Sequence, residues 1–259
     1  MANLRLPDQQ TVHSSSLTPR DRLIIALDVP SAAEARKIVA AVGEAACFYK
    51  VGKQLFTAEG PQVVRDLVAG GKKVFLDLKY HDIPNTVAGA VGEAAKLGVD
   101  MLTVHASGGA AMLRAAVEAA RARPGMAVLA VTVLTSMTDE DLESIGVRND
   151  SPSGMPGSRM LHQVVRLATL AVGCGCQGVV ASAHEARELR KGLGPQHVKD
   201  FLLVTPGVRP TGSAVGDQAR VVTPAEAIAA GATHIVVGRP ITGAGDPAGM
   251  VKGILREIA

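Results

Sequence analysis

The strongest constraint in this sequence is a plan that repeats from Arg22 onward: a short apolar run followed by an amphipathic, Ala-rich segment. The runs are bounded by glycine or polar residues and are rich in Val, Ile, Leu and Phe, which is typical of strands buried on both faces. We predict strands at Leu23–Val29, Ala46–Gly52, Lys73–Lys79, Met101–Ala106, Met126–Leu134, Gly178–Ser182, Phe201–Gly207 and His234–Gly238. Eight strand–helix units in about 240 residues predict an α/β fold, a single-domain (β/α)8 TIM barrel.

The segments between the runs have the pattern of helices. Ser31 is a plausible N-cap for the first helix, and glycines stand where several of the others end. The other predicted helices are roughly Glu59–Ala69, Thr86–Leu97, Ala110–Arg121, Leu161–Val172, His184–Lys191, Pro224–Ala230 and Ala248–Glu257. An open doubly wound sheet also alternates strands and helices, but its dinucleotide-binding version needs a glycine-rich turn after the first strand. That turn reads Ala26-Leu-Asp28-Val-Pro30-Ser31 here, which favours the closed barrel.

Composition excludes several classes of protein. A hydrophobic fraction of 47% excludes disorder for the chain as a whole. A net charge of +3 without basic blocks, together with Tyr 2, Phe 4 and Trp 0, argues against a dedicated nucleic-acid binder. The longest apolar run is too short for a membrane helix, which needs about 20 residues. Three sparse cysteines fit a reducing compartment, so we expect a cytoplasmic protein.

Three segments depart from the repeating plan. Residues 1–21 are polar and are predicted to be a flexible N-terminal extension, so that the barrel domain spans 22–259. Thr138–Met160 and Gly207–Thr223 are longer than ordinary connections, and loops of this length in compact domains are usually functional or mobile. Gly207–Thr223 lies after the seventh strand, and we expect it to act as a lid over a bound phosphate.

Charged residues stand at the C-terminal ends of predicted strands, where barrel enzymes keep their sites. Asp77 and Lys79 are two residues apart and should point the same way, and Lys50 of the preceding strand can lie beside Asp77. Asp28 ends the first strand. A structural salt-bridge network is the plain alternative, but buried ions are costly and apolar residues often serve stability equally well. The group therefore favours a functional site.

Lys79 is the candidate chemical group, because Asp77 and Asp82 flank it and favour its ammonium form. A charged ammonium suits a proton donor, whereas a Schiff-base aldolase needs a neutral amine. A second candidate site follows the seventh and eighth strands, at Arg209 and at Gly238-Arg239. The loops after these two strands often bind phosphate in barrels, and arginine offers a bidentate fork. No histidine, cysteine or carboxylate spacing indicates a metal site.

At these positions the chain resembles the orotidine 5′-phosphate decarboxylases, over nearly its whole length after about residue 22. The matching segments are Ala26-Leu-Asp28, Lys50-Val-Gly52-Lys53, Phe75-Leu-Asp77-Leu-Lys79-Tyr-His-Asp82-Ile-Pro-Asn-Thr86, Val104-His-Ala-Ser-Gly-Gly109, Val133-Leu-Thr135-Ser136-Met137, Val204-Thr-Pro-Gly-Val-Arg209-Pro, Gly216-Asp-Gln218 and Val237-Gly-Arg239-Pro. The pattern Asp-x-Lys-x-x-Asp also occurs in related sugar-phosphate lyases. The continuation His-Asp-Ile-Pro-Asn-Thr, together with Pro-Gly-Val-Arg-Pro, distinguishes the orotidylate enzymes.

The resemblance implies decarboxylation of orotidine 5′-phosphate to UMP and CO2, with no metal and no organic cofactor. It implies that Lys79 protonates C6 while Asp77 lies against the departing carboxylate. Lys50 would hold Asp77 and a ribose hydroxyl, as a catalytic and a binding residue, and Asp28 would also bind the ribose. The other implied substrate contacts are Thr135 or Ser136 at the pyrimidine edge, Gln218 between base and phosphate, and Arg209, Gly238 and Arg239 at the phosphate.

The resemblance also implies a homodimer in which Asp82 and Thr86 complete the partner subunit's site. Two other functions stay open at this point. A metal-dependent sugar-phosphate lyase of the same superfamily would lose its activity with a chelator. A phosphate-binding barrel without catalysis would bind UMP and would convert no substrate. Such a protein would have no use for the charged residues at the strand ends, whose removal from water costs free energy.

Overall fold

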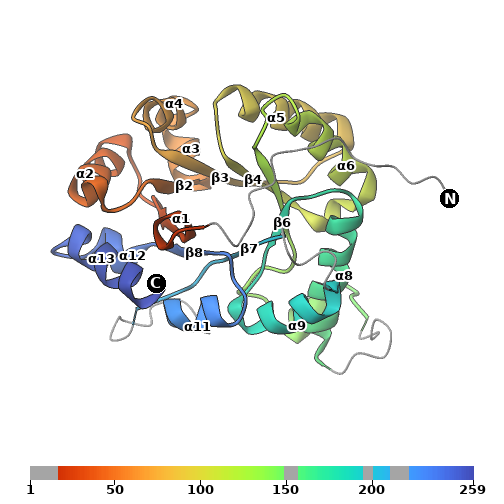
Figure 1. Ribbon diagram of the computed structural model, residues 1–259. Coiled ribbons are helices and arrows are strands. Elements are labelled where there is room, and N and C mark those ends of the chain that lie inside the picture. The colour runs from red at the N-terminus through yellow and green to blue at the C-terminus, as the bar shows by residue number, and fades with distance from the viewer. Residues whose placement is uncertain (1–16, 149–156, 195–200, 211–221) are drawn as a thin grey trace.

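The computed structural model describes residues 17–148, 157–194, 201–210 and 222–259. Eight parallel strands pair in sequence order and close into a barrel, which confirms the predicted (β/α)8 fold (Figure 1). The strands are β1 (Leu23–Ala26), β2 (Phe48–Gly52), β3 (Lys73–Tyr80), β4 (Met101–His105), β5 (Ala127–Val131), β6 (Gly178–Val180), β7 (Leu202–Thr205) and β8 (His234–Val237). Most predicted runs extend beyond their strands, because their last apolar residues belong to the loops at the C-terminal end.

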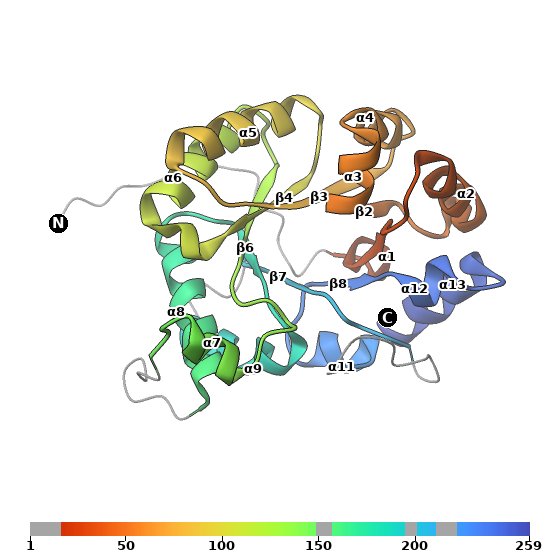
Figure 2. The same cartoon turned by 180° about the vertical axis from the view of Figure 1, so that it is seen from behind.

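Helices surround the barrel on its outside (Figures 1 and 2). They are α2 (Ala32–Val42), α3 (Lys53–Glu59), α4 (Gln62–Ala69), α5 (Pro84–Lys96), α6 (Gly109–Ala120), α7 (Asp139–Ser144), α8 (Arg159–Gly173), α9 (Ala183–Leu193), α11 (Pro224–Ala229), α12 (Arg239–Thr242) and α13 (Pro247–Glu257), with short 3₁₀ turns η2 (Gly43–Ala45) and η3 (Ala106–Gly108). The sequence pattern missed α3, α7 and α12. None of the described helices is long and apolar enough to cross a membrane.

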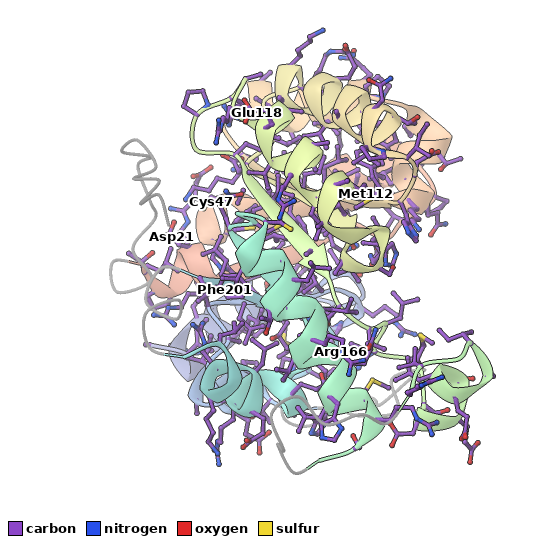
Figure 3. The ribbon with its side chains drawn as sticks, turned by 90° about the vertical axis from the view of Figure 1, so that its right-hand side faces the viewer. Asp21, Cys47, Met112, Glu118, Arg166 and Phe201 are labelled. Atoms are coloured by element: carbon purple, nitrogen blue, oxygen red, sulfur yellow. The ribbon has the colours of Figure 1, made fainter. Side chains whose placement is uncertain are left out.

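The strands are buried on both faces, so the apolar core has two layers. Inside the barrel, one cluster joins side chains of alternate strand positions: Ile24, Ala26, Phe48, Phe75, Met101, Ala127, Leu129, Leu202, Val204 and Val236. The larger cluster fills the space between the strands and the helices. Figure 3 shows this outer side where α6 and α8 lie next to each other, with Met112 buried and Arg166 on the exposed face of α8. Strand alternation thus leaves the inward positions near the C-terminal end for polar groups.

A short helix, α1 (Pro19–Arg22), precedes β1 and lies at the N-terminal end of the barrel (Figure 1). Thr18 caps it, and Asp21 forms an ion pair of 2.9 Å with Lys73 at the start of β3. Residues 19–21, which the sequence assigns to the extension, are therefore helical. Residues 1–16, residues 149–156 of the long segment after β5, and residues 211–221 lie outside the described residues. The predicted lid lies largely in the last of these gaps, and Gln218 lies within it.

Candidate active site

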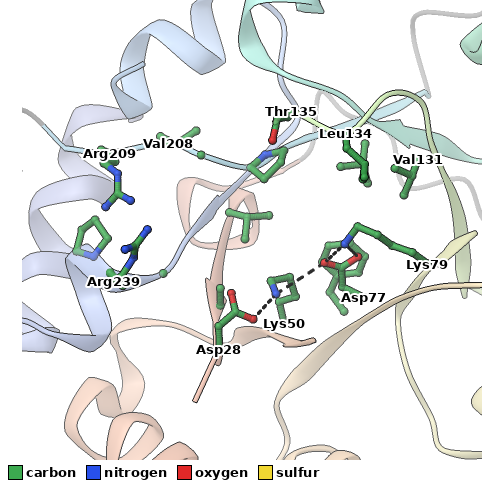
Figure 4. Close-up of a pocket in the computed structure, with 18 of the residues that line it drawn as sticks. Asp28, Lys50, Asp77, Lys79, Val131, Leu134, Thr135, Val208, Arg209 and Arg239 are labelled. Atoms are coloured by element: carbon green, nitrogen blue, oxygen red, sulfur yellow. Dashed lines mark hydrogen bonds and ion pairs between the residues drawn. The ribbon is translucent and has the colours of Figure 1, made fainter. Parts of the chain in front are cut away.

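A cavity of about 510 Å³ opens at the C-terminal end of the barrel (Figure 4). This volume is in the range of small-molecule sites. Both predicted clusters line the cavity, together with apolar side chains of β5, β6 and the loops that follow β5 and β7. The lining residues are Ala26, Asp28, Lys50, Phe75, Asp77, Lys79, Val131, Val133, Leu134, Thr135, Val180, Pro206, Gly207, Val208, Arg209, Val236, Gly238, Arg239, Pro240 and Thr242.

Asp28, Lys50, Asp77 and Lys79 form one continuous group, which we name the charge cluster. Lys79 Nζ donates to both carboxylate oxygens of Asp77, at 2.7 Å each. Lys50 Nζ lies 3.7 Å from Asp77 Oδ2 and donates to Asp28 Oδ1 at 2.6 Å. The side chains of Lys50 and Asp77 are only 10% and 13% exposed, so water screens their charges weakly. The predicted proximity of these residues is confirmed.

Asp77 remains ionised in this setting. Burial by itself raises the pKa of a carboxyl group, but the charges of Lys50 and Lys79 and the hydrogen bonds from Lys79 and Thr103 outweigh it. The net result is that the pKa of Asp77 lies below its ordinary value. The cluster therefore presents the carboxyl groups of Asp28 and Asp77 and the amino groups of Lys50 and Lys79 to whatever enters the cavity.

The backbone of β3 is irregular where it presents Lys79. β3 pairs with β4 at Leu76↔Leu102 and next at Tyr80↔Val104. Between these two pairs β3 moves forward by four residues and β4 by only two, so the register shifts. Lys79 has φ +53°, and among the described residues it alone has a positive φ without being glycine. Such a conformation costs about 1–3 kcal/mol and persists only where the surroundings impose it. The orientation of Lys79 is thus set by a local distortion and not by regular strand alternation.

Gly52 makes the contact between Lys50 and Asp28 possible. A Cβ at this position would lie 2.8 Å from Asp28 Oδ1 and 3.0 Å from Lys50 Nζ. The carboxylate of Asp28 would have to move away from the ammonium group. The glycine that ends β2 is therefore part of the site, although it carries no chemistry.

Arg209 and Arg239 form the second polar group, on the side of the cavity away from Lys79 (Figure 4). Arg209 is buried, with 7% of its surface exposed. Burial, together with the positive charge of Arg239, lowers the pKa of Arg209. Two neighbouring guanidinium groups repel each other, and an anion bound between them would offset this repulsion. Gly238 lines the same cavity, so the structure brings these three residues together at the C-terminal end of the barrel.

The structure places the remaining predicted residues as follows. Thr135 lines the cavity, whereas Ser136 is exposed and does not line it. Asp82 and Thr86 are exposed and lie outside the lining, and Asp82 Oδ1 accepts a hydrogen bond of 2.6 Å from the amide of Ile83. Within one chain, the carboxylate that holds the Lys79 ammonium is therefore Asp77.

Sequence reasoning missed Thr103, which joins the charge cluster from β4 and is fully buried. Its Oγ accepts from the amide of Lys79 at 2.9 Å and donates to Asp77 Oδ1 at 3.0 Å. One signal could have found it. Thr103 is the polar residue in an apolar run and has the same parity as His105, which ends that strand.

Among the described residues, no group of three or more His, Cys, Asp or Glu side chains is arranged to hold a metal ion. The cavity instead combines one buried carboxylate with ammonium groups at one side and guanidinium groups at the other. This arrangement suits an anionic organic substrate with two distinct polar ends.

Known proteins are similar to this chain in sequence and in fold. The chain is 48% identical over 246 residues to an orotidine 5′-phosphate decarboxylase of Moorella thermoacetica, and the match covers 92% of each chain. It is 52% identical to that of Halorhodospira halophila, with 92% of this chain and 96% of the relative covered. A crystal structure of orotidine 5′-phosphate decarboxylase from Lactobacillus acidophilus superimposes with a TM-score of 0.77 at 38% identity, covering 91% of this chain and 98% of the other.

The match also extends to a whole family and is not limited to single relatives. Residues 21–254 match the Orotidine 5′-phosphate decarboxylase / HUMPS family. This span contains the whole barrel from β1 to β8, and with it the charge cluster and both arginines. The chain therefore belongs to the Orotidine 5′-phosphate decarboxylase / HUMPS family.

Proposed function

We propose that this chain decarboxylates orotidine 5′-phosphate to UMP and CO2, in the last step of UMP biosynthesis, without a metal or an organic cofactor. One observation carries the proposal: a single cavity holds the Asp77–Lys79 pair on one side and the Arg209–Arg239 pair on the other. A nucleotide with a reacting carboxylate at one end and a phosphate at the other fits this distribution of charge. The relatives named orotidine 5′-phosphate decarboxylase, which are 48% and 52% identical to this chain, support the choice of substrate.

In the proposed reaction, the bond between C6 and the carboxylate carbon breaks and its electron pair stays on C6. This pair lies in the plane of the ring, where no adjacent carbonyl accepts it. The Lys79 ammonium stabilises the developing negative charge and then transfers a proton from Nζ to C6. Asp77 holds Nζ through both its oxygens and places a negative charge next to the leaving carboxylate.

The other groups bind and orient the substrate. Lys50 and Asp28 hold the ribose hydroxyls, and Thr135, which lines the cavity, binds the pyrimidine edge in preference to Ser136. Arg209, Arg239 and the backbone at Gly238 bind the phosphate, together with Gln218. Phosphate binding is remote from the bond that breaks, so its free energy can serve to orient the ring and exclude water.

We also propose a homodimer in which Asp82 and Thr86 complete the partner subunit's site. Both side chains are exposed beside the cavity-forming end of β3, and Ile83 between them is 66% exposed, although it is apolar. The test combines two variants, Lys79→Ala and Asp82→Ala, which should each be nearly inactive as homodimers. In a mixed dimer, one of the two sites holds an intact Lys79 and an intact Asp82, and activity should return. An inactive mixture after verified subunit exchange would refute the shared site.

The proposed activity is tested by the ultraviolet absorbance of orotidine 5′-phosphate after the protein is added in the presence of EDTA. A rapid decrease with UMP as product is the expected result. Activity that appears only with magnesium and a sugar phosphate would instead assign the chain to the metal-dependent sugar-phosphate lyases of the same superfamily. Binding of UMP without turnover under any condition would leave a binding protein. We propose the cytoplasm as its location, which the free thiols of Cys47, Cys174 and Cys176 support.

A further inference from the structure

Thr103 connects the two parts of the site that the decarboxylation depends on most. Its hydroxyl accepts a hydrogen bond from the backbone amide of Lys79 and donates one to the carboxylate of Asp77. The side chain is fully buried in β4. A single hydroxyl thus fixes both the main chain that carries the ammonium group and the carboxylate that holds this group.

The irregularity of β3 explains why a side chain has this task. Between Leu76 and Tyr80 the register of β3 against β4 shifts, and Lys79 adopts φ +53°. The regular ladder does not provide a carbonyl for the Lys79 amide here, and Thr103 Oγ accepts from it instead. Buried amides need a partner, so the hydroxyl stabilises a backbone conformation that lysine rarely adopts.

We propose that Thr103 is a positioning residue that holds the Lys79 main chain and the Asp77 carboxylate in the geometry required for proton transfer to the substrate. This inference rests on the proposed function. Thr103 does not line the cavity among the described residues, so it acts through Asp77 and Lys79 and not on the substrate. Its effect should therefore appear in the chemical step and not in substrate binding.

The test compares Thr103→Val, which keeps the shape and removes the hydroxyl, with Thr103→Ser, which keeps the hydroxyl. We expect Thr103→Val to lower kcat for orotidine 5′-phosphate about 10- to 100-fold, since a hydrogen bond to a charged group is lost. The Kd for UMP should change by less than about twofold, because the phosphate side of the cavity is untouched. Thr103→Ser should recover most of kcat.

Thr233 offers a matched control at the opposite end of the barrel. It is also a buried threonine, and its Oγ accepts from the amide of Leu203 at 2.9 Å and donates to its carbonyl at 3.1 Å. Thr233→Val removes both hydrogen bonds with Leu203 and the contact of 2.9 Å with Nδ1 of His234, far along the strands from the charge cluster. It should lower stability to a similar extent and leave kcat within about twofold of wild type. An equal loss of kcat in both valine variants would reduce Thr103 to a structural role.

A second readout does not depend on turnover. The hydrogen bond from Thr103 is one of the causes that hold the pKa of Asp77 low. Titration of the Asp77 carboxyl by carbon NMR should therefore give a higher pKa in Thr103→Val than in wild type or in Thr103→Ser. If the wild-type chain fails to decarboxylate the substrate, the proposed function fails, and this titration still decides whether Thr103 positions Asp77. An unchanged titration together with an unchanged kcat would overturn the inference.

Discussion

At the N-terminal end of the barrel, polar groups are paired or neutral and support the fold. Asp21 pairs with Lys73, and Thr233 Oγ lies 2.9 Å from Nδ1 of the buried His234. At the C-terminal end, the charge cluster and two adjacent arginines face a cavity instead. The two ends use the same residue types within one closed sheet. The difference teaches that burial of polar groups alone does not mark a site, whereas charges that face a cavity do.

The largest expected effect follows from removing the ammonium group at the C-terminal end. Lys79→Ala should lower kcat for orotidine 5′-phosphate by at least about a thousandfold, because both the proton donor and the stabilising charge are lost. Single-turnover assays at saturating substrate measure this loss. The matched variant at the other end, Lys73→Ala, should keep kcat within about twofold. Similar losses of kcat in both variants would contradict the conclusion that only the C-terminal end of the barrel takes part in the reaction.

The buried histidine of the N-terminal end should control stability against pH. Burial, together with the charges of Arg22 and Lys73, lowers the pKa of His234 from 6.5 to about 4. Between these values the unfolded chain binds the proton more readily, so the free energy of unfolding falls as the pH falls. The contribution of neutral His234 to the free energy of unfolding is complete above pH 6.5. Near pH 4, protonation of this histidine in the unfolded chain lowers the free energy of unfolding by on the order of 3 kcal/mol.

Urea unfolding between about pH 4 and pH 8 measures this dependence. His234→Gln should flatten it, whereas His184→Gln, at an exposed position in the first turn of α9, should leave it unchanged. Activity at neutral pH should stay the same in folded samples of both variants. A pH dependence that persists in His234→Gln would assign it to other groups.

The arginines of the C-terminal end should act on binding and not on chemistry. Arg239→Ala should raise KM for orotidine 5′-phosphate about 30-fold through loss of a charge-assisted contact. With orotidine, which lacks the phosphate, the variant and the wild type should have nearly equal kcat/KM. Arg256→Ala, an exposed position on α13, is the control. A loss of the same size with both substrates would argue against phosphate binding by Arg239.

The smallest expected effects come from the same substitution on each side of β1. Asp28→Asn should lower kcat/KM about tenfold, because Lys50 loses the carboxylate that it binds at 2.6 Å. Asp21→Asn should lower the free energy of unfolding by less than about 1 kcal/mol and leave kcat/KM unchanged, since its ion pair is partly exposed to water. Steady-state kinetics and urea unfolding separate the two results.

Much of the site was predictable because strands in a barrel are parallel and side chains alternate. These two rules place Asp28, Lys50 and Asp77 together from the positions at which their strands end. The same rules predicted that the side chains of Lys79 and Asp77 point in the same direction. The two side chains do meet, but the contact depends on a register shift and a positive φ that the alternation of side chains does not predict.

The remaining features depend on contacts between distant parts of the chain. Thr103 looks like an ordinary strand residue until β4 lies against the distorted part of β3. The choice between Thr135 and Ser136 as a cavity residue depends on how the loop after β5 turns. Helices α3 and α12 were missed because each is short and follows its strand directly, where the pattern for a strand masks the pattern for a helix.

By itself, the sequence determined the order and number of the strand–helix units, the closed barrel and the residues that meet at its C-terminal end, since these follow from periodicity and from the position of each residue in its strand. Only the tertiary structure decided which carboxylate holds the Lys79 ammonium, how the β3 backbone presents it and which buried hydroxyl supports it. The physical reason is distance. A hydrogen bond depends on tenths of an ångström between strands, and such distances arise only when the whole barrel closes.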